Sequence, residues 1–210
     1  MDRQSHWQAV YETKDATAVS WYEAEPRRSL DLIGRASADP QASVIDVGGG
    51  ASTLVDHLLA AGRRDVAVLD VSAEALARTR ARLGVSAGGV RWIVADITRW
   101  HPPRTWAIWH DRAVFHFLTD PDDQAGYLGA LQAATAPGGR VVLATFAPDG
   151  PERCSGLPVV RYDSEGLATR LGPGFALLES ARAVHVTPWG AGQRFTWALF
   201  RRRADQVANR

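Results

Sequence analysis

At residues 44–53 the chain reads Val44-Ile45-Asp46-Val47-Gly48-Gly49-Gly50-Ala51-Ser52-Thr53. The first four residues form a short, largely apolar run of the kind that a parallel sheet buries on both faces. The three glycines allow a tight turn and let a ligand approach the main chain closely. Ser52 or Thr53 can cap a following helix, whose apolar positions would be Leu54, Val55, Leu58 and Leu59. The stretch predicts a strand, a glycine turn and a helix with free N–H groups facing a ligand, although a purely structural turn would read the same.

A second apolar run, Val66-Ala67-Val68-Leu69-Asp70, ends in a carboxylate twenty residues after Gly50. In doubly wound sheets, an acid at the end of the second strand binds the ribose hydroxyls of a nucleoside. Carboxylate oxygens accept hydrogen bonds and ribose hydroxyls donate them, so the chemistry matches the position. The alternative is that Asp70 only begins the turn before the next helix, with Ser72 as its N-cap. The spacing favours the nucleoside site.

From Ser43 onward, strand-like and helix-like segments alternate. We expect strands at 44–47, 66–70, 90–95, 106–110 and 140–146, and helices at 25–33, 73–83 and 121–136, the last ended by Pro137-Gly138-Gly139. The segments 175–187 and 193–201 predict an antiparallel hairpin at one edge. The pattern predicts an α/β fold of the Rossmann-like, doubly wound type, with a seven-stranded and mostly parallel sheet. Ligands bind beyond the carboxyl ends of such strands, where the acids Asp46, Asp70, Asp96 and Asp111 fall.

Residues 1–42 precede the first strand, and residues 43–210 make up the expected ligand-binding domain. The leading segment is polar but carries Trp7, Tyr11 and Trp21. Trp7 and Tyr11 are four residues apart, on one face of a possible helix. This aromatic cluster is either a lid over the ligand pocket or ordinary packing of an amphipathic helix.

Length and charge limit the classes of function. The 210 residues suffice for one domain with a full core. The formal net charge of +1 gives no reason to expect nucleic acid or a membrane surface as a partner. The single cysteine, Cys154, cannot form an intrachain disulfide, and the first residues lack the apolar core of a signal peptide, so we expect a cytoplasmic protein. The six histidines show no recognised zinc-binding spacing, so we expect no metal.

Together, these motifs resemble those of the class I S-adenosylmethionine (SAM)-dependent methyltransferases. The matching residues are the strand and turn at 44–50, Asp70, Ala95-Asp96-Ile97 after the third strand, Pro137-Gly138-Gly139 before the fifth, and the closing hairpin. The resemblance covers residues 43–201. The leading segment, from His6-Trp7 to Ser20-Trp21-Tyr22, is similar to that of a bacterial branch of small, stand-alone methyltransferases. Gly49 stands where many members have cysteine or another small residue, and it keeps the turn possible.

The resemblance implies SAM as the cofactor, S-adenosylhomocysteine (SAH) as the product, and a set of cofactor contacts. The methionine part would lie against the glycine turn and the end of the fourth strand, at Asp46, Gly48, Gly49, Gly50 and His110. The ribose would bind Asp70, and the adenine would contact Val71, Asp96 and the backbone N–H of Ile97. The aromatic side chains of the lid would also reach the cofactor, at Trp7, Tyr11 and Trp21.

Methyl transfer from a sulfonium is a direct displacement, so the protein has to align the reactants and exclude water. An acceptor such as a phenol also needs a base, and His116 and Asp111 follow the fourth strand at a suitable place, although His116 can equally be a packing residue. Arg112 and Arg161 can orient an anionic acceptor, or can be structural ion-pair partners. The acceptor pocket would be walled by aromatic side chains, among them Phe146 and Tyr162.

The sequence predicts an enzyme that methylates a small molecule, because the compact chain leaves no room for a separate docking domain. Three alternatives stay open: methylation of a protein side chain such as lysine, SAM binding without catalysis, and a nicotinamide-dependent oxidoreductase. The oxidoreductase is disfavoured because Thr53 stands where the third glycine of G-x-G-x-x-G belongs. In addition, Lys14 is the only lysine and forms no Tyr-x-x-x-Lys pair.

Overall fold

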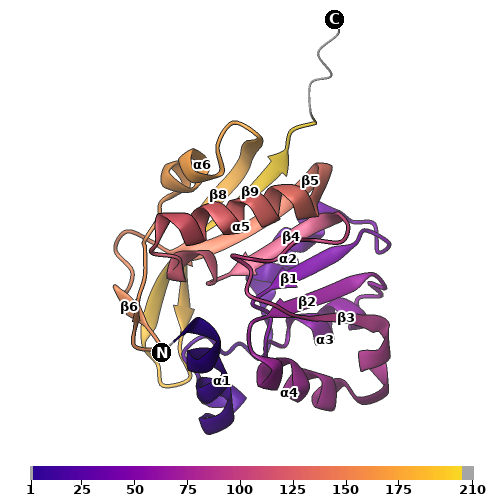
Figure 1. The fold of residues 1–210 in the computed structure, drawn as a ribbon, viewed down its shortest axis with the longest axis vertical. Coiled ribbons are helices and arrows are strands. Elements are labelled where there is room, and N and C mark those ends of the chain that lie inside the picture. Colours follow the sequence, from indigo (N-terminus) through magenta and orange to yellow (C-terminus); the bar gives the residue numbers. More distant parts are fainter. Residues whose placement is uncertain (1, 205–210) are drawn as a thin grey trace, which may run out of the picture.

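A seven-stranded sheet runs through the middle of the computed structural model, which describes residues 2–204 (Figure 1). Its strand order is β3-β2-β1-β4-β5-β9-β8. The strands are β1 (Val44–Val47), β2 (Val66–Asp70), β3 (Val90–Val94), β4 (Trp106–Arg112), β5 (Thr135–Phe146), β8 (Phe175–Val186) and β9 (Gly192–Arg202). Strands β1 to β5 are parallel, and β9 pairs antiparallel with β5 and β8. The predicted fold class is confirmed.

β1 lies at the centre of the parallel part and pairs with β2 on one side and β4 on the other. Its register places Val47 opposite both Leu69 and Asp111. The chain leaves β1 at Gly48, whose N–H donates to the carbonyl of Leu69 at 2.7 Å. Because these strands point the same way, the ends of β1, β2 and β4 form one edge at which ligand-binding side chains can gather.

Helices cover both faces of the sheet, as the alternation of segments predicted. One face carries α2 (Arg27–Ala36), α3 (Leu54–Ala60) and α4 (Ala73–Leu83). The other carries α5 (Pro121–Ala134) and α6 (Ser164–Leu171). Figure 1 shows α5 in front of the sheet and α2 and α3 behind it. Side chains alternate along a strand, so Val44 packs on the face covered by α2, α3 and α4, and Ile45 packs on the face covered by α5 and α6.

The leading segment forms α1 (Arg3–Thr13) and the short 3-10 helix η1 (Ala16–Ala18). In Figure 1, α1 lies beside α4, next to the edge where the parallel strands end. The Gln8 side-chain oxygen accepts a hydrogen bond from the Ser72 hydroxyl at 3.0 Å, and Arg78 donates to the carbonyl of Lys14 at 2.8 Å. These contacts fix the helix to the body of the molecule.

Two predicted helix boundaries are wrong. The helix expected at 25–33 runs instead from Arg27 to Ala36, because Pro26 is its N-cap and Gly34 continues it. Residues 137–139, expected to end α5, lie inside β5 instead. Gly138 has a φ of +75° there, and the pairing of β5 with β4 shifts register in this region. An irregular strand start therefore takes up the proline and glycines that looked like a helix stop.

The end of β4 also differs from the prediction. The strand extends beyond His110, so Asp111 and Arg112 are strand residues that pair with β5. The loop after β5 contains a small antiparallel hairpin made of β6 (Arg153–Cys154) and β7 (Leu157–Pro158). The longer β4 and the hairpin after β5 determine which side chains lie at the carboxyl ends of the strands.

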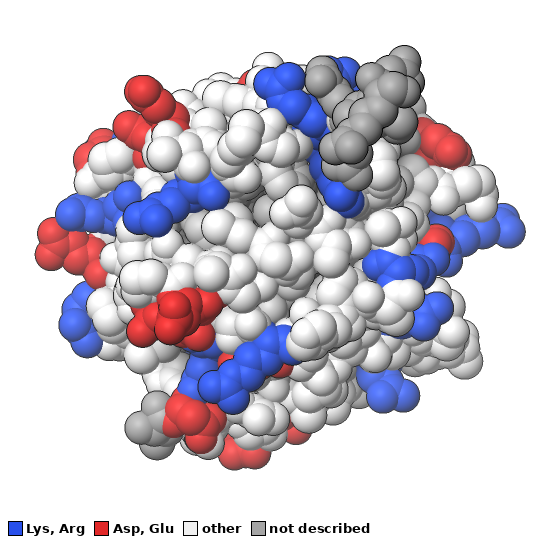
Figure 2. Space-filling view, turned by 45° about the horizontal axis from the view of Figure 1, so that its top comes forward, with Lys and Arg blue, Asp and Glu red and all other residues white. Residues whose placement is uncertain are grey.

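The surface carries charge of both signs. On the face drawn in Figure 2, basic and acidic side chains are interspersed around a largely uncharged centre. This distribution fits the formal net charge of +1. Among residues 2–204, no helix is both long and apolar enough to cross a membrane.

A buried chain of hydrogen bonds joins α5 to β4. The Trp109 indole donates to the Tyr127 hydroxyl at 3.1 Å, and that hydroxyl donates to Asp111 Oδ2 at 2.6 Å. Asp111 also accepts from the backbone N–H groups of Val114 and Phe115 at 2.8 and 3.0 Å. Since the Asp111 side chain is completely buried, it serves as an internal acceptor that fixes the segment after β4.

We expect Tyr127→Phe to destabilise the protein by about 2 kcal/mol, because it leaves the Trp109 indole and one Asp111 oxygen short of a partner in a dry interior. Urea unfolding measures this loss. Tyr162→Phe is the matched control, because the Tyr162 hydroxyl accepts from Gln124 at 3.2 Å and Gln124 keeps its bond to the Leu118 carbonyl. Equal losses in the two variants would contradict a special role for the buried chain.

Candidate functional site

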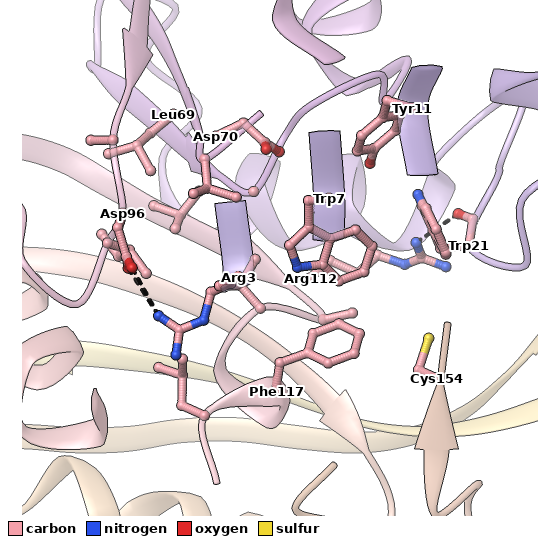
Figure 3. A pocket seen from close by; sticks show the side chains of 18 residues that line it. Arg3, Trp7, Tyr11, Trp21, Leu69, Asp70, Asp96, Arg112, Phe117 and Cys154 are labelled. Atoms are coloured by element: carbon pink, nitrogen blue, oxygen red, sulfur yellow. Dashed lines mark hydrogen bonds and ion pairs between the residues drawn. The ribbon is translucent and has the colours of Figure 1, made fainter. Parts of the chain in front are cut away.

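A cavity of about 90 Å³ lies under α1, at the carboxyl ends of β1, β2 and β4 (Figure 3). We call it the main pocket, and its side chains include Arg3, Trp7, Tyr11, Trp21, Leu69, Asp70, Val71, Asp96, Ile97, Arg112, Phe117 and Cys154. A second cavity of about 50 Å³, the side pocket, shares Tyr11, Trp21, Gly48 and Arg112 with it and extends to Glu23, Gly49, Asp46 and His110.

The glycine turn forms one wall of both pockets. Gly48 and Gly50 have φ values of +69° and +38°, in the region that favours glycine. A Cβ at Gly48 would collide with Val114, and one at Gly49 would collide with Asp46. At Gly50 a Cβ would lie 2.7 Å from Asp70 Oδ2. Gly48 and Gly50 are therefore restricted to glycine by their φ values, and a side chain at Gly49 would have to displace Asp46 or Val68. A ligand can approach the bare main chain of this turn.

Asp70 lies at the end of β2, next to this turn. Its carboxylate accepts from the backbone N–H of Ser72 at 2.8 Å, and Ser72 caps α4 by accepting from Ala75 at 3.2 Å. The turn role and the pocket role thus coexist at Asp70. Only 6% of the residue surface is exposed, and this burial raises the pKa of Asp70 to about 7. Neighbouring Val71 and Ile97 line the same part of the main pocket.

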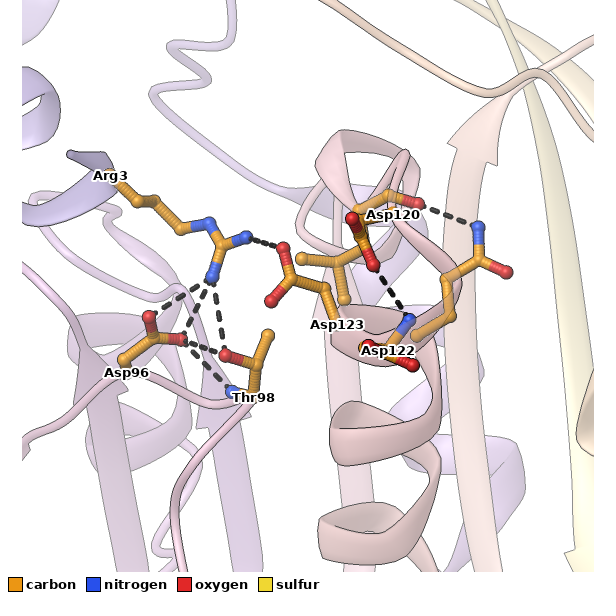
Figure 4. A network of polar contacts seen from close by, with 8 residues as sticks. Arg3, Asp96, Thr98, Asp120, Asp122 and Asp123 are labelled. Carbon is orange, nitrogen blue, oxygen red and sulfur yellow. Dashed lines mark hydrogen bonds and ion pairs between the residues drawn. The ribbon is translucent and has the colours of Figure 1, made fainter. Parts of the chain in front are cut away.

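Asp96 is tied to α1 through Arg3 (Figure 4). Arg3 Nη1 lies 3.0 Å from both Asp96 oxygens and 3.3 Å from the Thr98 hydroxyl. Arg3 Nη2 pairs with Asp123 on α5. Partial burial raises the pKa of Asp96, but hydrogen bonds from Thr98 and the nearby Arg3 charge outweigh it and hold that pKa below its ordinary value. Arg3 therefore joins the start of α1 to Asp96, which follows β3, and to Asp123 on α5.

An aromatic cluster forms the side of the main pocket nearest α1. Trp7 packs edge to face on Trp21 and on Phe117, with ring centroids 5.6 and 5.0 Å apart. Tyr11 packs edge to face on Trp21 at 6.2 Å. The rings therefore pack on one another and also line the main pocket.

A buried relay of polar side chains supports the side pocket. Asp46 Oδ1 lies 2.7 Å from His110 Nδ1, and His110 Nε2 lies 2.9 Å from the Ser29 hydroxyl on α2. All three residues are almost fully buried. The relay therefore fixes the Asp46 and His110 side chains to α2, while the backbone beside them faces the cavity.

Arg112 ends β4 and lines both pockets. Its Nη1 donates to the Trp21 carbonyl at 2.9 Å, and its Nη2 lies 3.3 Å from Glu23 Oε1. Glu23 in turn lies 3.2 Å from His185 Nδ1 on β8. Burial raises the pKa of Glu23, but the His185 hydrogen bond and the Arg112 charge outweigh it, so the pKa is held below its ordinary value.

Contrary to the sequence-based hypothesis, His116 and Asp111 line neither pocket. His116 is completely buried, its Nδ1 accepts from the Phe146 N–H at 3.2 Å, and burial lowers its pKa to about 3. The Asp111 oxygens are taken up by two backbone N–H groups and Tyr127. Neither side chain is placed to take a proton from a molecule in the main pocket.

Three residues that were predicted to bind the methyl acceptor also lie outside the two pockets. Phe146 is buried against His116 and Phe195. Tyr162 packs on Phe115 on the opposite side of the sheet, with ring centroids 5.4 Å apart. Arg161 pairs with Glu152 at the surface, at 3.2 Å. Of the predicted substrate-binding residues, only Arg112 reaches the cavity.

Among the residues that sequence reasoning missed are Arg3, Glu23 and Phe117, which line the pockets, and His185, which contacts Glu23. Arg3 and Glu23 belong to the polar leading segment, and His185 lies on an edge strand, so their patterns carry no local signal. Phe117 lies in the 3-10 helix η3 (Phe115–Phe117) that follows β4. Its place just beyond a strand end is the one signal that pointed to the pocket.

Comparisons with known proteins agree with this geometry. Residues 44–139 match a family model described as a methyltransferase domain. No curated protein sequence matches the chain. Among solved structures, the chain is similar to a SAM-dependent methyltransferase from Anabaena variabilis, with 15% identity, coverage of 97% of this chain and 96% of that one, and a TM-score of 0.74.

Two further solved structures were obtained with SAH. The N-methyltransferase NodS from Bradyrhizobium japonicum is 17% identical over 96% of this chain and 99% of its own, with a TM-score of 0.72. The 1,6-didemethyltoxoflavin-N1-methyltransferase from Burkholderia thailandensis, with bound 1,6-didemethyltoxoflavin, is 21% identical over 95% and 87%, with a TM-score of 0.71. Such identities establish a common fold.

The matched residues contain the glycine turn, Asp70, Asp96 and the end of β4, which form part of the pocket walls. The resemblance seen in the sequence is confirmed: residues 44–139 match the methyltransferase-domain model, and the chain has the fold of the class I SAM-dependent methyltransferases.

Proposed function

We propose that the chain is an enzyme that transfers a methyl group from SAM to a small molecule. The observation that carries this proposal is Asp70, a carboxylate buried at the end of β2 beside a turn of three glycines. Burying a carboxylate is costly unless donors surround it. The two hydroxyls of a ribose would supply such donors at this position.

The other pocket residues fit the rest of the cofactor. Val71 and Ile97 offer apolar contact for an adenine, and Asp96 can accept from its amino group. At the other end, the glycine turn, Asp46 and the backbone at His110 border a space for the methionine part. Trp7, Tyr11 and Trp21 supply aromatic faces, which attract a cationic sulfonium.

The chemistry then asks little of the protein beyond placement. When bound, SAM supplies a methyl group activated by its sulfonium. The chain binds and orients the two reactants under α1 and keeps water from the cavity. Glu23 and the ring nitrogens of His110 are already occupied by neighbours. We therefore propose an acceptor that enters the site already unprotonated.

Within residues 1–42, α1 and the segment up to Trp21 act as the lid of this site, whereas α2 packs on the sheet. Residues 43–210, of which the last six lie outside the described residues, form the body. α1 and the segment after it supply Arg3, Trp7, Tyr11 and Trp21 to the pocket wall. A cavity roofed in this way favours a small molecule over a folded protein as the acceptor. Among the structural neighbours, one has 1,6-didemethyltoxoflavin bound.

The buried Asp70 should make stability depend on pH. Its pKa rises from 3.8 to about 7 on folding. The stability that the protonated carboxyl group contributes is therefore fully present below pH 3.8 and is lost as pH rises through 7. Between pH 4 and pH 8, we expect the free energy of unfolding of Asp70→Asn to rise by on the order of 2 kcal/mol relative to that of wild type. Thermal melting of both proteins across this range measures the difference. Parallel curves would contradict the burial argument, since the Asp111 contribution is common to both.

The same substitution should weaken cofactor binding. We expect wild type to bind SAH with a Kd in about the micromolar range. Asp70→Asn should bind SAH about tenfold or more weakly, because its side chain has one acceptor oxygen and can pair with only one of the two ribose hydroxyls. Isothermal titration calorimetry measures both. Asp163→Asn, at the N-cap of α6 and away from the pockets, is the control and should bind as wild type does. Unchanged affinity in a folded Asp70→Asn protein would rule out the ribose assignment.

Arg3 should hold the lid in place. Arg3→Gln removes the ion pairs to Asp96 and Asp123, so we expect faster amide hydrogen exchange in α1 and faster dissociation of SAH. Arg27→Gln, which removes only an exposed pair with Glu25, is the matched control. Identical α1 exchange in wild type and Arg3→Gln would show that these ion pairs do not fasten the lid.

A further inference from the structure

Arg112 is buried in the site with part of its hydrogen-bonding capacity unused. Only 11% of its side chain is exposed, and Nε and Nη2 have no hydrogen-bond partner. Nη1 alone donates, to the Trp21 carbonyl at 2.9 Å. A guanidinium offers five N–H donors, and leaving them unpaired away from water is unfavourable. The missing partners point to a ligand group that accepts hydrogen bonds and carries negative charge.

The place of Arg112 in the sheet separates it from the proposed nucleoside contacts. Asp70 ends β2, whereas Arg112 ends β4, and β1 lies between the two strands. Two strand spacings amount to roughly 10 Å. The guanidinium also leans toward β9, over the Phe195 ring at 5.2 Å from its centroid. Figure 3 shows Arg112 beside Trp21 and facing Cys154, at the opposite end of the pocket from Asp96.

The walls beside Arg112 are flat and apolar. Trp7, Trp21 and Phe117 present aromatic surface in the main pocket, and Trp7 is in edge-to-face contact with each of the other two. Such walls suit a planar ring, and the arginine suits an oxygen pair attached to that ring.

We propose that Arg112 binds the negatively charged oxygen pair, such as a carboxylate, of a planar small-molecule acceptor. This inference rests on the proposed function and names its substrate class. Glu23 shows how the site holds an anion, because its carboxylate lies 3.3 Å from Arg112 Nη2 without forming a hydrogen bond to it. Because neither Nε nor Nη2 is exposed to solvent, an arriving carboxylate would reach them by displacing Glu23 from beside the guanidinium.

A carboxylate at Arg112 has two possible sources, the acceptor and the methionine part of the cofactor. The two are separated by comparing SAH with 5′-methylthioadenosine, which keeps the nucleoside but lacks the amino acid. If Arg112 binds the acceptor, Arg112→Met should bind both molecules within about threefold of wild type. A fall of about tenfold or more for SAH alone would assign Arg112 to the cofactor and overturn the inference.

The acceptor side is tested by titrating the SAH-loaded protein with benzoate and salicylate, using benzamide as the neutral match. We expect wild type to bind at least one of the two carboxylates about tenfold more tightly than benzamide, and Arg112→Met to lose this preference. Arg112→Lys keeps the charge without the planar fork, so we expect an intermediate preference.

A second variant covers the case in which Arg112→Met fails to fold. Glu23→Gln keeps a side chain that can bond to His185 but removes the competing charge, so carboxylate binding should become tighter than in wild type. Equal binding of carboxylates and benzamide in wild type, or weaker carboxylate binding in Glu23→Gln, would overturn the inference. Failure of wild type to bind SAH at all is a different result, because it refutes the proposed function before any acceptor probe is added.

Discussion

The site depends on the pairing of β1 with two parallel neighbours at once. β1 is only four residues long, and all four are buried. It must therefore pair with β2 and β4 to satisfy its backbone groups. That pairing brings Gly48, Asp70 and Arg112 to one edge, although they are far apart in the sequence. A change that shifted this register would move the turn away from both acid and arginine.

Three buried carboxylates near this edge show how hydrogen bonding separates structural from ligand-binding acids. Asp111 accepts from two backbone N–H groups and Tyr127, so it is already satisfied. Asp46 pairs with His110, which is fixed by Ser29. Asp70 faces the cavity beside the glycine turn, with Ser72 as a local donor. Among these three, Asp70 is the acid best placed to receive a ligand.

The sequence predicted the parts of the site that local patterns specify. The strand, glycine turn and helix at 44–60 and the acid at Asp70 follow from short-range rules, and the parallel sheet follows from the alternation of strands with helices. His116 was predicted to act as a base, but it is buried. β4 extends past His110, so Asp111 is a strand residue with a buried side chain, and His116 accepts from the N–H of Phe146 at the end of β5. Arg3 and Glu23 were missed because only tertiary packing brings the leading segment to the strand ends.

The most direct test of this account is a crystal structure of the protein grown with SAH. The account predicts density for SAH under α1, with the ribose hydroxyls on the Asp70 carboxylate and the adenine between Val71 and Ile97. The methionine part should lie along the glycine turn. Density for SAH at another place on the molecule, or with its ribose away from Asp70, would contradict the assignment of this edge of the sheet as the cofactor site.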